Sequence, residues 1–565
     1  MFIFIIFINR YNDNMNQKRH PLAAEGQSSI ESFVTRGVQL YNQGHPRQKA
    51  ITEALILELI IACNLPLSLV ENTHFRSFMS VVDQRYNPVS RSVVNRRLNE
   101  LAKEMDLTIK QKLDRASTVN VTVDIWTDRS MRGYLGVTAH FIEMETRAPT
   151  LKSVLLRCDR FTGSHTDERI HEKFEEMCEY FNIRHKLDYI ICDNAANMKK
   201  AFTTSFPSEK PKREETDELE NAALWEELAD DFQEDVDAIQ SSCRQQRLQC
   251  FAHTLQLVVR DGLKETKSLN IPITKVSKLW SMLHSACKIK EAFEETFGAN
   301  RSIPGAVSTR WNSTLCLVDT VTNLDLQTLN TLLETQGHKE LCLSTTEWSH
   351  LNELVEVLSP FLQATDLTQG EKVVSISAAL PCVLSLNSHL MVMQNTTRYL
   401  VNLVKTLQVS LRQRFQGIFV NVKMDHTPEN TEPLPFGNAV YMMSALLDPS
   451  FCFFWLEQDV HAPDEAKNQV KQMIMDLILA ETCKGSPEKP TCETGADEEK
   501  AAAAPAKVLP RLFSGYRKKH TLDYNSSVQT ELMRYIAHST DEDEIFFVGN
   551  NKFSPTAIFL HIISS

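Results

Sequence analysis

The stretch STVNVTVDIWTD, residues 117–128, sets the pattern of the fold. Val119, Val121 and Val123 alternate with polar residues, and this period of two predicts a half-buried β-strand. We place the functional end of the strand at Asp124. An aspartate in this position either binds a ligand or caps the turn that follows it.

The segments downstream extend this strand into a sheet. GYLGVTAHFIE (133–143) and LKSVLLRCDRF (151–161) predict two more strands, each joined by a short link, so an antiparallel meander is the simplest arrangement. A helix is expected over 167–181, followed by a fourth strand over 187–192 and a second helix. One face of the first helix is apolar: Ile170, Phe174, Met177 and Phe181.

The fourth strand ends in YIICDNAANMKKAF, residues 189–202, where an apolar run stops at Asp193. If the first and fourth strands are neighbours, Asp124 and Asp193 come together. Two carboxylates repel one another unless a cation such as Mg²⁺ or Mn²⁺ lies between them. The alternative is that each aspartate caps its own turn or helix.

Composition limits the class of protein. The chain has 565 residues, 42% of them hydrophobic, a net charge of −12 and 13 cysteines with no CxxC pair. These values predict several domains in a reducing compartment, and they argue against coating of nucleic acid by bulk charge. The opening MFIFIIFINR is too short to span a bilayer and lacks the flanks of a signal peptide, so we expect no membrane association.

A basic region precedes the first strand. Residues 76–115 contain many Lys and Arg residues, Arg96 and Arg97 among them, and form the best local candidate for a phosphate-facing surface. The alternative is a solvated helix face, because acids such as Glu100 and Glu104 are interleaved. Residues 1–28 are expected to be disordered and 29–115 helical.

The second half of the chain is mainly helical in pattern. An acidic insertion at about 206–242 contains 12 acids and no Lys or Arg between residues 214 and 237. Together with that insertion, residues 116–315 are expected to form the α/β core, and 316–480 a helical domain. A low-complexity linker (481–507) and a short C-terminal segment (508–565) follow.

Two short motifs near the end of the core suggest a site. Cys250 and His253 are three residues apart, which suits a buried Cys and a positioning His better than zinc, because a zinc site needs about four ligands. In STRWNSTL, Arg310 beside Trp311 suits contact with phosphate and base, but equally ordinary packing at a domain edge.

The sequence as a whole resembles the hAT-type DNA transposases and the zinc finger BED domain-containing proteins derived from them. The resemblance covers most of residues 30–547. Its motifs are VDIWTDRSMRGYLGVTAHFI (123–142), IICDNAANM (190–198), CFAHTLQLVV (250–259), STRWNS (308–313) and ALLDPSF (445–451).

The resemblance implies a ribonuclease H-like core, a mixed sheet flanked by helices, interrupted by a large all-helical insertion. In that family three carboxylates hold two divalent metals for strand cleavage and transfer, and Asp124 and Asp193 match the first two. It also implies that the Cys250/His253 and Arg310/Trp311 pairs lie near DNA.

The sequence departs from the family at both ends. The third carboxylate is a Glu beyond the helical insertion, and the sequence after residues 531–547 diverges before a clear counterpart, which also puts dimerisation in doubt. The N-terminus has no Cys pair followed by a His/Cys pair, so no BED zinc finger is expected.

These observations predict a transposase-derived nuclear protein that binds DNA or chromatin proteins without strand transfer. One alternative is an active transposase whose third acid is Glu542 or Glu544, and another is a protein-interaction scaffold. Nuclear localisation rests mainly on the resemblance, because KPKR (210–213) and RKK (517–519) are weak import signals.

Overall fold

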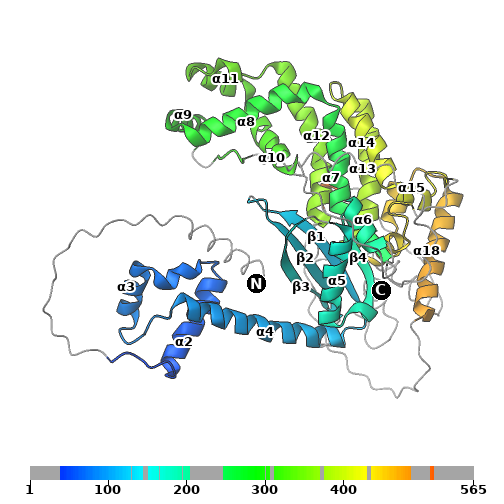
Figure 1. Ribbon diagram of the computed structural model, residues 1–565. Coiled ribbons are helices and arrows are strands. Elements are labelled where there is room, and N and C mark those ends of the chain that lie inside the picture. Colours follow the sequence, from blue (N-terminus) through cyan, green and yellow to red (C-terminus); the bar gives the residue numbers. More distant parts are fainter. Residues whose placement is uncertain are drawn as a thin grey trace, which may run out of the picture. The chain divides into compact units, whose positions relative to one another are not determined.

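The computed structural model in Figure 1 divides the chain into two compact units, Met1–Glu143 with Ser153–Leu187, and Met144–Lys152 with Asp188–Ser565. It describes residues 39–128, 130–143, 150–163, 166–193, 195–203, 246–298, 301–305, 311–368, 375–428, 434–484 and 510–513. Several segments discussed above lie outside these residues: MFIFIIFINR, the acidic insertion, Arg310, both basic runs, Glu542 and Glu544.

The first unit begins with a small helical cluster. An apolar core (Leu55, Ile56, Ile60, Leu67, Val70, Val94 and Leu98) holds it together. Its elements are α2 (Pro46–Ala54), the π-helix η1 (Leu55–Ile61), the 3₁₀-helix η2 (Leu67–Glu71), α3 (Thr73–Val82) and the N-terminal half of α4 (Arg91–Arg115). At 25 residues, α4 is about 37 Å long. It therefore links this cluster to the strands that follow.

The C-terminal half of α4 is fastened to the rest of the unit by polar contacts. Lys112 lies 2.9 Å from Glu143, and the hydroxyl of Tyr180 donates to Asp106 at 2.9 Å. Lys186 donates to the last-turn carbonyls of Leu113 and Asp114, at 3.1 and 2.5 Å. A cation at this end also complements the helix dipole.

A five-stranded sheet forms the α/β part, in the order β3-β2-β1-β4-β5. Its strands are β1 (Val119–Thr127), β2 (Gly133–Glu143), β3 (Thr150–Phe161), β4 (Leu187–Cys192) and β5 (Gln246–Gln249), with α5 (Asp167–Phe181) before β4 and α6 (Ala196–Thr203) after it. β1 and β2 are antiparallel, whereas β4 and β5 are parallel. The predicted mixed sheet is confirmed, and the sheet order meets the condition that the first and fourth strands are neighbours.

The end of the first strand was predicted wrongly. β1 continues to Thr127, so Asp124 lies within the strand, opposite Gly136. Beyond Asp124 the strand continues through Ile125, Trp126 and Thr127, where burial no longer alternates between a buried and an exposed face. A Cβ on Gly136 would lie only 2.7 Å from the Trp126 ring, so the missing side chain lets the indole lie across the strand.

Helices make up most of the second unit and share one large apolar core. They are α7 (Phe251–Lys264), α8 (Asn270–Ser285), α9 (Cys287–Phe297), α10 (Trp311–Thr322), α11 (Leu326–Thr335), α12 (Thr345–Thr368), α13 (Ile376–Thr396), α14 (Val401–Arg414), α15 (Gln416–Asn421), α16 (Val440–Leu447), α17 (Phe454–Gln458) and α18 (Asp464–Lys484). Leucines recur at helical spacing on α12 (Leu351, Leu354 and Leu358) and α14 (Leu403, Leu407 and Leu411), and all six lie in this core.

The helix α13 is long and apolar enough to cross a membrane by length and composition alone. In this structure 72% of its most apolar window is buried. It packs against α12, α14 and α16, which makes it the central helix of the helical core.

A close helix crossing joins α7 to α14. A Cβ on Gly262 would lie 2.7 Å from Leu407 Cδ2 and 2.9 Å from Leu403 Cδ1. Beside it, the Asp261 carboxylate accepts hydrogen bonds from the Ser410 hydroxyl at 2.6 Å and from Arg414 Nε at 3.0 Å. The glycine allows the helices to approach, and the polar bonds fix their register.

Replacing Gly262 with valine should overpack this crossing. We expect Gly262→Val to lower the free energy of unfolding by about 1–3 kcal/mol, measured by urea denaturation followed by circular dichroism. Gly44→Val is the control, because a Cβ there meets only Asn42 Oδ1 at 3.6 Å. Equal effects of the two changes would contradict the crossing geometry.

A histidine links three strands of the sheet. His140 Nε2 lies 3.2 Å from the Thr122 hydroxyl, and its Nδ1 lies 2.9 Å from that of Ser153. Burial lowers the pKa of His140 below its ordinary value of 6.5. The folded state binds a proton at His140 less readily than the unfolded state does. The contribution of His140 to the free energy of unfolding is therefore fully present above pH 6.5, and it is lost as the pH falls through the pKa of His140 in the folded protein.

The His140→Gln variant should therefore lose less stability than the wild type between pH 7.5 and pH 5.5. Glutamine keeps a polar side chain at the position but does not titrate. His74→Gln, on the exposed side of α3, should keep the wild-type pH dependence. Urea denaturation at both pH values tests this, and parallel curves for all three proteins would refute it.

Candidate functional site

The turn after β4 holds Asp193, the second predicted acid. Its Oδ1 accepts a hydrogen bond from the Ala195 N–H at 3.2 Å, and α6 begins one residue later. One carboxylate oxygen thus stabilises the local turn, as the capping alternative expects. The other oxygen adds a second potential ligand atom at the end of the strand.

Arg247 of β5 reaches across to this turn. Its Nε donates to the Cys192 sulfur at 3.1 Å, and its NH2 group donates to the Asp193 carbonyl at 2.6 Å. Burial raises the pKa of the Cys192 thiol to about 11 despite the nearby guanidinium. Cys192 is therefore a neutral acceptor at pH 7. Arg247 is not among the predicted site residues, although a cation within the short strand β5 is a usable signal in the sequence.

Cys250 and His253 lie where β5 leads into α7. The Cys250 N–H donates to the Cys192 carbonyl at 2.8 Å, and the residue is the N-cap of α7. His253 is half-buried in the first turn of that helix. The described ranges contain no group of three or more His, Cys, Asp or Glu residues able to hold a metal, so a zinc set around this pair finds no support there.

A buried phenol supports the same region from α16. Tyr441 is 4% exposed, and burial, followed by the nearby Cys250 and Tyr189, raises its pKa. Tyr441 also packs against Phe436, with ring centroids 5.3 Å apart. Tyr441 is therefore an uncharged, largely apolar neighbour of Cys250 at the end of β5.

Asp124 lies on the exposed side of β1. Because side chains two apart share a strand face, Trp126 lies on the same face, 38% exposed and stacked on Tyr134 at 5.8 Å. An exposed tryptophan beside an acid is a surface feature that the strand pattern alone did not single out. The sheet order makes β1 and β4 neighbours, so the two predicted acids come from adjacent strands.

The other predicted residues occupy separate places. Trp311 begins α10 and packs against the helical core, and its indole Nε1 has no hydrogen-bond partner within the described ranges. The helix α10 contacts α7 and α8. Because Arg310 lies outside the described residues, its pairing with Trp311 stays a prediction.

On α4, the two arginines differ in their surroundings. Arg97 is bound by Glu53 at 2.9 Å, Glu104 at 3.1 Å and Glu100 at 3.5 Å, and the Glu53 bond raises its pKa. Arg96 is 71% exposed and lies 3.9 Å from Glu100. A phosphate would have to compete with three carboxylates for Arg97, whereas Arg96 is more accessible.

The ALLDPSF motif has a structural role in the helical core. Asp448 is 4% exposed, and it accepts hydrogen bonds from the Ser377 hydroxyl at 2.8 Å and from the Ser450 N–H at 3.0 Å. These bonds tie the end of α16 to the start of α13. A buried carboxylate satisfied in this way is costly to disturb.

We expect Asp448→Ala to lower the free energy of unfolding by about 2–3 kcal/mol, because it leaves the Ser377 hydroxyl and a backbone N–H without their acceptor. Thermal denaturation measures the loss. Asp476→Ala on α18 is the matched control, since Asp476 is exposed and bonds only locally to Gln472, and its effect should stay within about 0.5 kcal/mol. Similar losses of stability in Asp448→Ala and Asp476→Ala would show that the hydrogen bonds of Asp448 do not stabilise the helical core.

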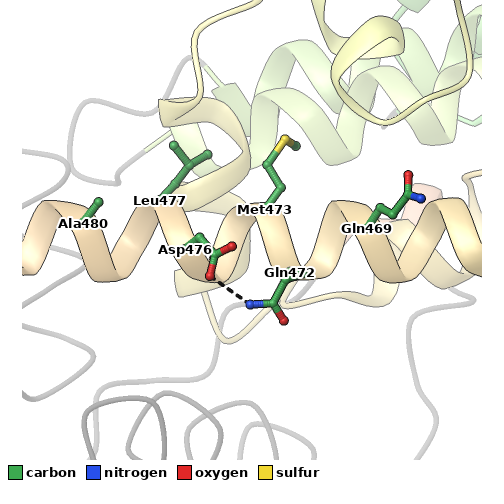
Figure 2. Close-up of a pocket in the computed structure, with 6 residues that line it drawn as sticks. All are labelled: Gln469, Gln472, Met473, Asp476, Leu477 and Ala480. Atoms are coloured by element: carbon green, nitrogen blue, oxygen red, sulfur yellow. Dashed lines mark hydrogen bonds between the residues drawn. The ribbon is translucent and has the colours of Figure 1, made fainter.

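A shallow hollow lies along α18 (Figure 2). The half-buried Met473 and Leu477 line it together with Gln469, Gln472, Asp476 and Ala480. Gln472 donates to Asp476 at 2.8 Å across its edge. All six residues come from a single helix, and none of the predicted site residues is among them.

The five-stranded mixed sheet followed by a largely helical region defines an RNase-like protein with a helical domain. Two family models match this chain: the ZBED1 RNase-like domain over residues 122–211 and the ZBED1 RNase-like helical domain over residues 248–357. The first match contains Asp124, Asp193 and the turn between β4 and α6. The second begins in β5 and continues into the helices.

Curated relatives agree with this class. "Zinc finger BED domain-containing protein 4" of Homo sapiens is 20% identical over 84% of the chain, and "Putative AC transposase" of Zea mays is 23% identical over 55%. "Putative transcriptional regulator tpeD" of Talaromyces stipitatus is 23% identical over 61%. The chain spans 36% to 41% of the length of these three proteins. It is a distant homologue of the hAT transposases and the zinc finger BED domain-containing proteins.

Proposed function

We propose that this transposase-derived protein binds DNA in the nucleus, alone or with chromatin proteins, and does not transfer strands. The observation that carries the proposal is the pair of acids, Asp124 and Asp193, on adjacent strands of a sheet matched by the RNase-like family model. The relatives include proteins whose names describe a transposase and a transcriptional regulator. Both names fit a role on DNA.

The donor chemistry suits a hard divalent cation. Two carboxylates with water completing the shell are typical ligands of Mg²⁺ or Mn²⁺. Asp124 is exposed on its strand and Asp193 is half-buried at the end of its own, so solvent and a phosphate oxygen have access. We propose that these two residues hold one such ion, which would supply charge stabilisation for a bound phosphate.

Strand transfer by the two-metal route needs more ligands than this pair. In the described part of the chain, no third acid, His or Cys joins either aspartate in a potential metal-binding group. With two carboxylates, one ion can bind phosphate, but a second ion would lack its own ligands. The third acid that the family resemblance implies is expected beyond the helical insertion, outside the described residues, so the absence of strand transfer stays part of the proposal.

We propose that DNA contacts Cys250 and His253 near Asp193 in the second unit and, separately, the more exposed Arg96 of α4 in the first. The expected contribution of Arg310 beside Trp311 lies outside the described residues. Because the chain is acidic as a whole, binding would depend on such local groups and should weaken steeply with salt. Arg97 contributes less, since three glutamates already surround it.

Calorimetry with Mn²⁺ and a DNA-binding and nicking assay test the proposal. The wild type should bind Mn²⁺, the Asp124→Ala/Asp193→Ala variant should lose that binding, and both proteins should leave labelled duplex DNA uncut. Cleavage that disappears in Asp124→Ala would establish an active transposase instead. No DNA binding even at low salt would favour a protein-interaction scaffold.

A further inference from the structure

Arg247 lies in β5 opposite Ile190 of β4 in the parallel register. Its side chain extends along β4 as far as the turn, where it bonds the Cys192 sulfur and the Asp193 carbonyl. The guanidinium therefore links a side chain and a main-chain atom of two successive residues. It is half-buried and belongs to the same compact unit as the turn.

Arginine is well suited to making both contacts with one side chain. Its planar fork presents several N–H donors in fixed directions, whereas lysine offers one compact ammonium group. The two bonds use different nitrogens, Nε and NH2, at 3.1 and 2.6 Å. A charged donor on a carbonyl also makes a stronger bond than a neutral one.

Three hydrogen bonds converge on the residues around Asp193. Arg247 holds the Asp193 carbonyl, the Cys250 N–H holds the Cys192 carbonyl, and the Ala195 N–H holds Asp193 Oδ1. The Arg247 bond to Asp193 goes to the main-chain oxygen, so it fixes the turn without occupying the carboxylate oxygens. The direction of the Asp193 side chain follows from the conformation of this turn.

We infer that Arg247 is a positioning residue, which orients the Asp193 carboxylate for a divalent cation by fixing the turn that carries it. This inference rests on the proposed metal-binding function of Asp124 and Asp193. Groups that orient a metal ligand typically change affinity by about 10–100-fold when they are removed. Arg247 would act in this way without touching the ion.

The test uses the full chain with Arg247→Lys and Arg247→Met. Mn²⁺ affinity is measured by calorimetry, thermal stability by circular dichroism, and amide hydrogen exchange in the peptide that contains Asp193 and Ala195 without metal. We expect at least about tenfold weaker Mn²⁺ binding in both variants, with faster exchange in that peptide. Arg398→Met, at an exposed position in the same unit, should match the wild type.

The background variant Asp193→Ala separates positioning from general stability. If Arg247 acts through Asp193, Arg247→Lys should not weaken Mn²⁺ binding further once Asp193 is gone. Should Arg247→Met unfold, Arg247→Lys still decides the question, because it keeps the charge and most of the packing.

Two results would overturn the inference in distinguishable ways. Wild-type Mn²⁺ affinity in both Arg247 variants would show that Arg247 has only a structural role, and the proposed metal site would stand. No Mn²⁺ binding by the wild type beyond that of Asp124→Ala/Asp193→Ala would remove the metal site itself, and the positioning role with it.

Discussion

The parallel pairing of β4 with β5 is the contact on which the candidate site depends. It joins residues 189–192 to residues 246–249, although more than fifty residues separate them in sequence. Only this pairing places Arg247 and Cys250 beside Asp193. The entropic cost of closing a loop rises only slowly with its length. A long connection between two parallel strands is therefore tolerated without loss of their pairing.

The pairing also explains why polar groups can gather in a sheet that is otherwise apolar. The carboxyl ends of parallel strands meet at one edge, where main-chain bonds stop and side chains must complete the hydrogen bonding. Arg247 and the Cys250 N–H do so for Cys192 and Asp193. Tyr441 of α16, an electrostatic neighbour of Cys250, is buried and packs against Phe436. The end of parallel strands in an open sheet is the usual setting of a ligand site.

The sequence predicts those parts of the structure in which apolar residues recur with a regular period of two or 3.6. The strands, the α5 stripe and the leucine stripes of α12 and α14 follow from periods of two and 3.6, because burial of one face dictates them. The true end of β1 did not follow, since it is set by pairing with β2 as far as Thr127 opposite Gly133, and the apolar period stops earlier. Arg247 and Asp448 were missed for a similar reason. Each is defined by partners that are distant in sequence, and neither period nor composition encodes such partners.

For the proposed binding of DNA, charge compensation decides which cations of this chain attract phosphate. A basic residue attracts phosphate most strongly where neighbouring acidic side chains do not neutralise its charge. The number of Lys and Arg residues in a sequence does not show which of them are in this position. On α4 the interleaved glutamates surround Arg97 but leave Arg96 mostly exposed. Arg247 contrasts with both, because its charge is directed inward at a carbonyl and a thiol. In an acidic protein a few uncompensated cations, together with an ion held by carboxylates, can outweigh the unfavourable net charge close to the surface, because salt screens the distant acids within about 8–10 Å.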